Sequence, residues 1–215
     1  MNNKILISLG IILFLGVCAY AAYMMFAPLP TPGAIEDIPT NLDPVQILDY
    51  HTKLPSIKSG GVTFDMNVKA KYKISGVIES TKSYHKDGAS RISPFDYAIS
   101  WGDVPEMAQY MKFSQYGRFC NYTYDLNSPV DPKYVVNHMS NNHMIPANAN
   151  IRRSLPTARK GNKVIVEGYL VSVTGSASGK GTFHWNTSLK REDYGDGACE
   201  IIYVTRLQIN NRVYE

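Results

Sequence analysis

A strict alternation of apolar and polar side chains over residues 62–78 most constrains the fold of this chain. Every even position is apolar or small, and every odd position except Val77 is polar. Successive side chains of a strand point to opposite faces, so the pattern predicts β-structure with one buried and one wet face. The stretch exceeds an average strand, so it is either a hairpin or one long coiled strand bent at Gly76.

Further strands and short helices are expected along the rest of the chain. Strands are predicted at residues 97–101, 113–124, 163–173 and 200–209, and helices at 105–111, 132–137 and 150–155. The stretch 164–173 is apolar on both faces around Glu167 and Gly168, which is typical of a central strand. The class is therefore mainly β with short helices. A small closed β-barrel resembling an OB-fold is expected, with a β-sandwich as the alternative.

The N-terminus contains an uncharged apolar run over residues 5–27. As a helix of about 1.5 Å per residue, these 23 residues exceed the hydrocarbon thickness of a bilayer, about 30 Å. The run also explains why only 19% of the chain is charged, below a typical soluble domain. Lys4 precedes the run and the next basic residue is Lys53, so the positive-inside rule predicts a cytoplasmic N-terminus and an exported remainder.

Two other interpretations of this run remain open. Residues 19–21 form an A-x-A motif, as a signal peptide cleaved after Ala21 would have. Cys18 suggests a lipoprotein, but bulky Val17 precedes it where a small residue is expected. The run continues apolar through residues 23–26, which favours an uncleaved transmembrane anchor. All three interpretations export the same domain.

A Pro-rich linker is predicted between the anchor and the globular domain, over residues 28–59. Pro28, Pro30 and Pro32 stiffen its start, and a short helix is expected at residues 44–51. Residues 60–215 then form an exported β-barrel-like domain of one-core size.

Cysteines and histidines define two further candidate sites. Cys120 and Cys199 lie in the exported domain, where oxidation is possible, so they are the disulfide candidate; two buried thiols are the alternative. His138, His143 and His184 match no metal-binding spacing, and we expect neither a metal nor another cofactor.

A polar cleft is the main candidate binding site, because two loops combine arginine, carboxylate and aromatic residues. Such a set stacks a sugar or clamps a carboxylate. The alternative is turn chemistry with ion pairs that hold long loops. A paired acid and base formed by Asp96 and Glu200 would make the protein a hydrolase. The candidate binding residues are Arg91, Asp96, Trp101, His143, Trp185, Arg191 and Glu200.

A basic row on the wet face of the alternating stretch bears on nucleic-acid binding. Lys69, Lys71 and Lys73 alternate there, and OB-folds bind single strands through basic and aromatic surfaces. The net charge of +4 is modest and the domain is expected to be exported, so a solvated strand face is favoured and nucleic acid is an unlikely partner.

Several sequence blocks together resemble a family of uncharacterised bacterial proteins. The blocks are residues 91–96 (RISPFD) with Trp101-Gly102, 143–147 (HMIPA), 160–171 and 185–200, which ends in Gly-Ala-Cys-Glu. The resemblance covers about residues 60–207. It implies one N-terminal membrane helix and an exported β-rich domain, and it transfers no catalytic role.

These observations predict a single-pass protein of the bacterial cytoplasmic (inner) membrane with a periplasmic or other extracytoplasmic domain. The domain is expected to be a binding or scaffold module of the cell envelope, with another envelope protein or a glycan as its partner. An envelope hydrolase acting on a glycan and an exported OB-like domain that binds single-stranded DNA are the alternatives. No recognisable catalytic constellation is present, so an enzyme is the less favoured class.

Overall fold

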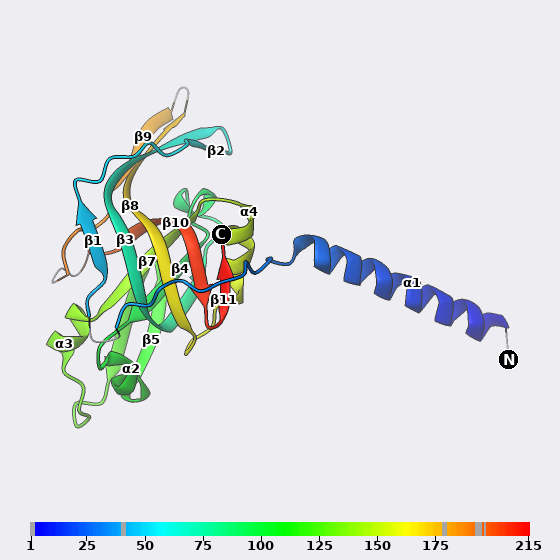
Figure 1. Cartoon of the computed structure of the whole chain (residues 1–215), viewed down its shortest axis with the longest axis horizontal. Helices are drawn as coiled ribbons and strands as arrows, with labels where there is room; N and C mark the ends of the chain where they lie inside the picture. Colours follow the sequence, from blue (N-terminus) through cyan, green and yellow to red (C-terminus); the bar gives the residue numbers. More distant parts are fainter. Residues whose placement is uncertain (1–2, 40–41, 178–179, 192–194, 196) are drawn as a thin grey trace.

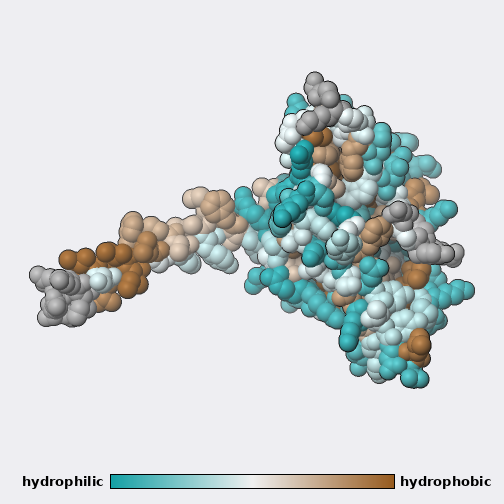
Figure 2. Space-filling view, turned by 180° about the vertical axis from the view of Figure 1, so that it is seen from behind, coloured by the Kyte–Doolittle hydropathy of each residue, from teal (hydrophilic) through white to brown (hydrophobic). Residues whose placement is uncertain are grey.

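The structure, a computed structural model, describes residues 3–39, 42–177, 180–191, 195 and 197–215. Helix α1 (Asn3–Phe26) extends away from a β-rich domain, and the chain enters that domain beside helix α4 and the C-terminus (Figure 1). Within α1, Ile7–Phe26 is long and apolar enough to cross a membrane, and all residues of this span are exposed. Figure 2 shows apolar atoms covering this helix, whereas the domain surface is mostly hydrophilic.

Most of the domain is one nine-stranded sheet. Its strands are β1 (Val45–Leu48), β2 (Ile57–Ser59), β3 (Val62–Ser83), β4 (Phe95–Ser100), β7 (Met139–Pro146), β8 (Lys163–Ala177), β9 (Lys180–Trp185), β10 (Glu200–Ile209) and β11 (Arg212–Tyr214). Strands β5 (Met111–Tyr116) and β6 (Phe119–Tyr124) form a separate hairpin. The α-helices are α2 (Val104–Met107), α3 (Pro132–Asn137) and α4 (Ala149–Ser154), with 3-10 turns η1 (Ala89–Arg91), η2 (Ala108–Tyr110) and η3 (Leu155–Thr157).

The hydrogen-bonded pairs of five strands return to their starting point. Strand β3 pairs with β4, and β4 with β7, both antiparallel. Strand β7 pairs parallel with β10, and β10 pairs antiparallel with β8. Strand β8 then pairs antiparallel with β3 along 14 registered positions. The strands therefore belong to one continuous sheet, rather than to two packed sheets as a sandwich requires.

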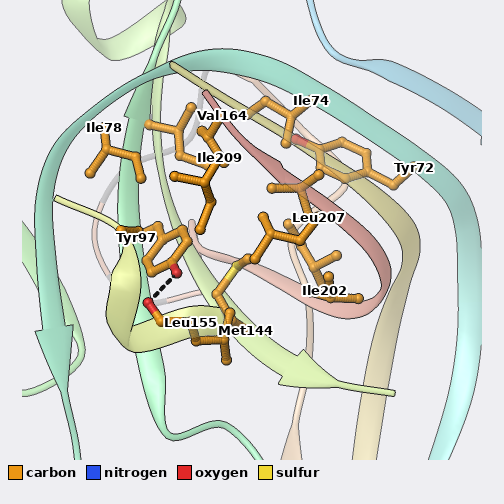
Figure 3. Packing of buried hydrophobic residues seen from close by; sticks show 14 of the residues in the cluster. Tyr72, Ile74, Ile78, Tyr97, Met144, Leu155, Val164, Ile202, Leu207 and Ile209 are labelled. Atoms are coloured by element: carbon orange, nitrogen blue, oxygen red, sulfur yellow. Dashed lines mark hydrogen bonds between the residues drawn. The ribbon is translucent and has the colours of Figure 1, made fainter. Parts of the chain in front are cut away.

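The long alternating stretch is one strand, as one of the two sequence interpretations proposed. Strand β3 runs for 22 residues and curves around the core (Figures 1 and 3). Gly76 permits the close approach of β4, since a Cβ at this position would lie 2.2 Å from the carbonyl oxygen of Ser100. The even residues of β3 do not share one face, because the register with β8 shifts between Val68 and Ala70 and places Phe64 and Ala70 in different apolar clusters. The missing side chain at Gly76 lets β3 and β4 come together.

The main core lies inside the curve of these strands. It is formed by buried side chains from β3, β4, β7, β8 and β10. Helix α4, turn η3 and the residue after it cover this core through Ile151, Leu155 and Ala158. The hydroxyl of Tyr97 donates to the carbonyl oxygen of Leu155 at 2.5 Å, which ties the covering turn to β4 (Figure 3). A second apolar cluster lies on the opposite face of the sheet, around Phe64, Ile145, Val171 and Ile201.

The prediction of a helix at residues 44–51 is wrong. Residues Val45–Leu48 form strand β1, which pairs antiparallel with residues 70–73 of β3. An isolated helix of eight residues is marginal in water, whereas the unpaired edge of β3 offers the same residues backbone partners.

The predicted linker is also bound to the domain over much of its length. The side chain of Asn150 accepts from Leu29 N at 2.8 Å and donates to Leu29 O at 2.9 Å. Ile35 is buried against Ile165 and Val213. Only two residues separate the end of α1 from the first of these contacts, so the domain follows the helix directly.

Other elements agree with their predicted positions. Helix α3 begins after Asp131, whose carboxylate accepts from Lys133 N and Tyr134 N as an N-cap. Strands predicted at 97–101, 163–173 and 200–209 correspond to β4, β8 and β10. The strand predicted at 113–124 is instead the hairpin β5–β6, which turns at Gly117.

Glu79 is a buried carboxyl at an irregularity of β3. The register with β4 shifts between Ile78 and Ser80, and the Glu79 side chain accepts a 2.7 Å hydrogen bond from Ser100 Oγ. Burial raises the pKa of Glu79, and the Ser100 hydrogen bond and the Lys160 charge offset this only in part. A carboxyl whose pKa is raised by folding costs stability as pH rises through that pKa.

We therefore expect Glu79→Gln to raise the free energy of unfolding at pH 7 by about 1 kcal/mol, because the amide removes the charge and keeps the shape. At pH 4 the gain should shrink, since the carboxyl is then largely protonated in both states. Urea unfolding of both proteins at the two pH values measures this. An equal effect at pH 4 and pH 7 would contradict the assignment.

Candidate functional site

The site begins with a buried pair on two neighbouring strands. The register of β4 and β7 places Asp96 directly opposite His143, on the sheet face away from the main core. Asp96 is fully buried and His143 is 2% exposed. Nδ1 of His143 lies 2.9 Å from Oδ1 of Asp96, so the imidazole and the carboxylate are in direct contact.

Arg118 completes this pair from the tip of the β5–β6 hairpin. Its Nη1 donates to the same Oδ1 of Asp96 at 2.7 Å. Both residues of the two-residue turn have positive φ, 58° at Gly117 and 74° at Arg118, as a type I′ hairpin requires. This conformation is unusual for arginine, and the contacts of its side chain hold it in place.

The remaining guanidinium atoms of Arg118 bind the loop between β3 and β4. Nε and Nη2 donate to the two carboxylate oxygens of Asp87 at 3.2 and 2.9 Å. Nη2 also donates to the carbonyl oxygen of Ser93 at 2.9 Å. The guanidinium carbon lies 3.9 Å from the ring centroid of Tyr84. Arg118 therefore joins the hairpin, the β3–β4 loop and strand β4.

Trp185, at the end of β9, covers this cluster from the other side. Its ring centroid lies 4.6 Å from that of His143 and 5.7 Å from the guanidinium carbon of Arg118. Around these side chains is an open pocket of about 470 Å³. It is lined by Gly117, Arg118, Phe119, His143, His184, Trp185, Asn186, Gly197 and Cys199.

One guanidinium and two carboxylates lie together at the pocket floor. Burial alone would raise the pKa of Asp87, but hydrogen bonds and the charge of Arg118 hold it below its usual value. Asp87 and Asp96 thus share one arginine, and the cluster offers no unpaired cation to an anionic ligand. The pocket can instead offer a flat aromatic face, imidazole and amide groups to a neutral polar molecule.

Sequence analysis did not identify Arg118, the residue with the most contacts in this site. The stretch 113–124 has the composition of one strand, and Gly117 was the signal of a turn within it. Tyr84 and Asp87 were missed for a similar reason, since nothing in the sequence shows that their loop meets the hairpin.

Two of the predicted cleft residues belong to a different place. Glu200 pairs in register with Asn142, the neighbour of His143, so Glu200 and Asp96 lie on opposite faces of the sheet. Arg191 Nη1 lies 2.8 Å from Glu200 Oε1 and 3.3 Å from the hydroxyl of Tyr72. Burial raises the pKa of that tyrosine. The prediction that Asp96 and Glu200 form an acid–base pair is therefore wrong.

Trp101 and Arg91 do not line the pocket either. Trp101 is 2% exposed in the main core, and its Nε1 donates to Asp43 at 3.0 Å. Arg91 is exposed, and its Nη1 donates to Gly60 O at 3.3 Å. Of the seven predicted binding residues, the structure brings together Asp96, His143 and Trp185. The prediction that all seven residues line one cleft is wrong, because alternate residues of a strand face opposite sides of the sheet.

The histidines do not converge, and the described part of the chain contains no group of three or more His, Cys, Asp or Glu side chains placed to hold a metal ion. His138 stacks on Tyr134 with ring centroids 3.8 Å apart, whereas His143 and His184 line the pocket. Cys120 and Cys199 are both half-buried, and the structure contains no disulfide between them.

Comparison with known proteins gives no relative. No family model matches the chain, and no curated protein or solved structure matches it. The resemblance to a bacterial family stays a prediction, and function has to be argued from the geometry of the chain itself.

Proposed function

We propose that this chain is a single-pass membrane protein of the bacterial envelope whose extracytoplasmic OB-type barrel binds a neutral glycan. The observation that carries the proposal is the convergence of Trp185, His143 and Arg118 around one open pocket. The fold, the charge balance and the N-terminal helix support it in different ways.

The strand order supports an OB-type barrel. With β3, β4, β7, β8 and β10 taken as strands one to five, the observed pairs are one–two, two–three, three–five, five–four and four–one. This order of pairs supports a five-stranded Greek-key barrel of the OB type. Helix α4 lies between the third and fourth strands and covers the core, as the single helix of that fold does.

The place of the pocket supports a binding role. OB-folds bind oligosaccharides and oligonucleotides over strands two and three, flanked by the loops that follow strands one and four. Here strands two and three supply Asp96 and His143. The loop after strand one supplies Tyr84 and Asp87, and the segment after strand four supplies Trp185.

The charge balance favours a neutral ligand over nucleic acid. Arg118 is shared by two carboxylates, so it has little capacity to neutralise a phosphate. The lysine row of β3 is outside the pocket, and Lys73 is itself paired with Glu167 at 3.3 Å. A sugar ring stacked on Trp185 needs no cation and can use the surrounding imidazole and amide groups.

The N-terminal helix supports membrane attachment. Lys4 is the only charged residue on its N-terminal side, and the first charged residues beyond it are Glu36 and Asp37. This bias favours a cytoplasmic N-terminus and an exported domain. The contacts of Leu29 with Asn150 then hold the barrel close to the membrane surface.

We expect Trp185→Ala to weaken binding of neutral oligosaccharides at least about tenfold, because the stacking face is lost. The chain has two tryptophans and Trp101 is buried, so the fluorescence of Trp185 in detergent-solubilised full-length protein reports binding directly. Titrations use a panel of neutral oligosaccharides, a sulfated oligosaccharide and a dT oligonucleotide. Because the Trp185→Ala variant lacks this fluorophore, its affinity for each ligand is measured by isothermal titration calorimetry.

Tyr110→Ala is the matched control, since this exposed aromatic lies on η2 and does not line the pocket. It should bind as the wild type does. Equal affinities of the Trp185 variant and the wild type would refute the proposed site. Binding of only the oligonucleotide, with strong salt dependence, would replace glycan with nucleic acid as the ligand.

A further inference from the structure

Cys120 and Cys199 both line a second, smaller pocket of about 140 Å³. Cys120 belongs to the β5–β6 hairpin, and Cys199 directly precedes β10. Phe119 and Cys199 also line the larger pocket, so the two pockets are neighbours. Two half-buried thiols from elements far apart in the sequence thus line one pocket beside the candidate binding site.

Asn141 of β7 lies between Cys199 and the backbone of the hairpin that carries Cys120. Its Nδ2 lies 3.7 Å from Cys199 Sγ and donates to Arg118 O at 2.8 Å. Cys199 Sγ itself lies 3.8 Å from Arg118 O, two residues before Cys120.

The register of the hairpin places Cys120 on the same side. Gln115 pairs with Cys120, and paired residues of antiparallel strands share a face. Gln115 Nε2 donates to Asn141 Oδ1 at 3.2 Å, so that face is turned toward Asn141. The side chains of both cysteines therefore face the same amide group.

We propose that Cys120 and Cys199 form a reversible disulfide that locks the β5–β6 hairpin onto β10 and so holds Arg118 at the floor of the binding pocket. The bond would act two residues from Arg118, whose guanidinium joins the hairpin to Asp96 and Asp87. The proposal needs an exported domain, where disulfides form and persist. It does not depend on the chemistry of the ligand.

The oxidant is a second disulfide, of a small thiol or of an exported oxidoreductase. The Cys199 thiolate attacks one of its sulfurs, which breaks that S–S bond and releases one thiol. Cys120 then loses its proton, attacks Cys199 Sγ in the mixed disulfide and releases the second thiol. The two cysteines lose two electrons and two protons in total, and the oxidant becomes two thiols. Burial and the nearby Cys199 raise the pKa of Cys120 to about 12, so Cys120 has to lose its proton in the second step.

The test uses full-length protein in detergent with Cys18→Ser, which leaves two cysteines. Treatment with oxidised glutathione should lower the number of titratable thiols per protein from two to none. Tryptic digestion should then give a disulfide-linked peptide that joins Cys120 to Cys199, and the protein should retain no glutathione. The bond closes about 80 residues, so the melting temperature should rise by roughly 10 °C and fall again with dithiothreitol.

Two single variants serve as controls. Cys120→Ser and Cys199→Ser, each with Cys18→Ser, should retain one bound glutathione and show no rise in melting temperature. Glutathione retained on both cysteines of the two-cysteine protein would overturn the proposal, because it shows that the thiols cannot meet. Cross-linked dimers as the main product would overturn it as well. Neither result bears on glycan binding, which the Trp185 titration tests separately.

Discussion

Replacing Arg118 with alanine is expected to lower the free energy of unfolding by about 3–5 kcal/mol. The Asp96 carboxylate is fully buried, and Arg118 is the cation that compensates it at 2.7 Å. Without the guanidinium, the domain retains a buried charge and loses the contacts that hold the hairpin to Asp87 and Ser93. Urea unfolding followed by far-UV circular dichroism measures the change.

Arg206→Ala is the matched control for this prediction. Arg206 also binds two carboxylates, Glu167 at 2.9 Å and Glu215 at 3.0 Å, but its side chain is 38% exposed. Exposed pairs contribute about 0–1 kcal/mol, so this variant should remain near wild-type stability. A loss of stability in Arg118→Ala no larger than that in Arg206→Ala would contradict the prediction that the buried Asp96 carboxylate needs a cation. Arg118→Lys should recover part of the stability, since it restores the charge without the planar set of donors.

Gly168→Ala is expected to lower the free energy of unfolding by about 3 kcal/mol, through overpacking of backbone against backbone. Gly168 lies in β8, where it pairs with Tyr72 of β3 and Val204 of β10. A Cβ at this position would lie 2.0 Å from the carbonyl oxygen of Tyr203, so one of the two strand pairs has to move apart. Thermal and urea unfolding both report this loss.

Gly181→Ala separates this steric effect from the general effect of replacing glycine in a strand. Gly181 lies in β9, and a Cβ there would meet no atom within 4 Å. Its stability should stay within about 0.5 kcal/mol of the wild type. If Gly168→Ala were as stable as Gly181→Ala, the close contact between β8 and β10 would be refuted.

The elements with local signals could be predicted. The alternation over residues 62–78 identified this stretch as β-structure, and Asp131 followed by Pro132 identified the start of α3, because side-chain periodicity and capping depend on near neighbours. The register shift between Val68 and Ala70, which changes the face of the even residues, has no such local signal. The linker was harder to predict. Residues 44–51 have a helix start signal, but β3 supplies a strand partner, and tertiary pairing overrides a weak local preference.

The candidate site was only partly predictable. Asp96, His143 and Trp185 were identified as residues of the right chemistry, whereas Trp101 and Glu200 were assigned to the same cleft although they face elsewhere. Which strands are neighbours, and which face a loop residue meets, depend on pairings between residues far apart in the chain. Arg118 acts on Asp96 only because a hairpin folds back over β4.

The sequence by itself therefore determined the β-rich class, the apolar N-terminal helix and the place of the longest strand, since each of these follows from the order of neighbouring side chains. Only the tertiary structure decided that the linker becomes an edge strand and that Asp96 and Glu200 are separated by the sheet. It also decided that Arg118, His143 and Trp185 surround one pocket. These features depend on strand register and on contacts across the sheet, which no local pattern encodes.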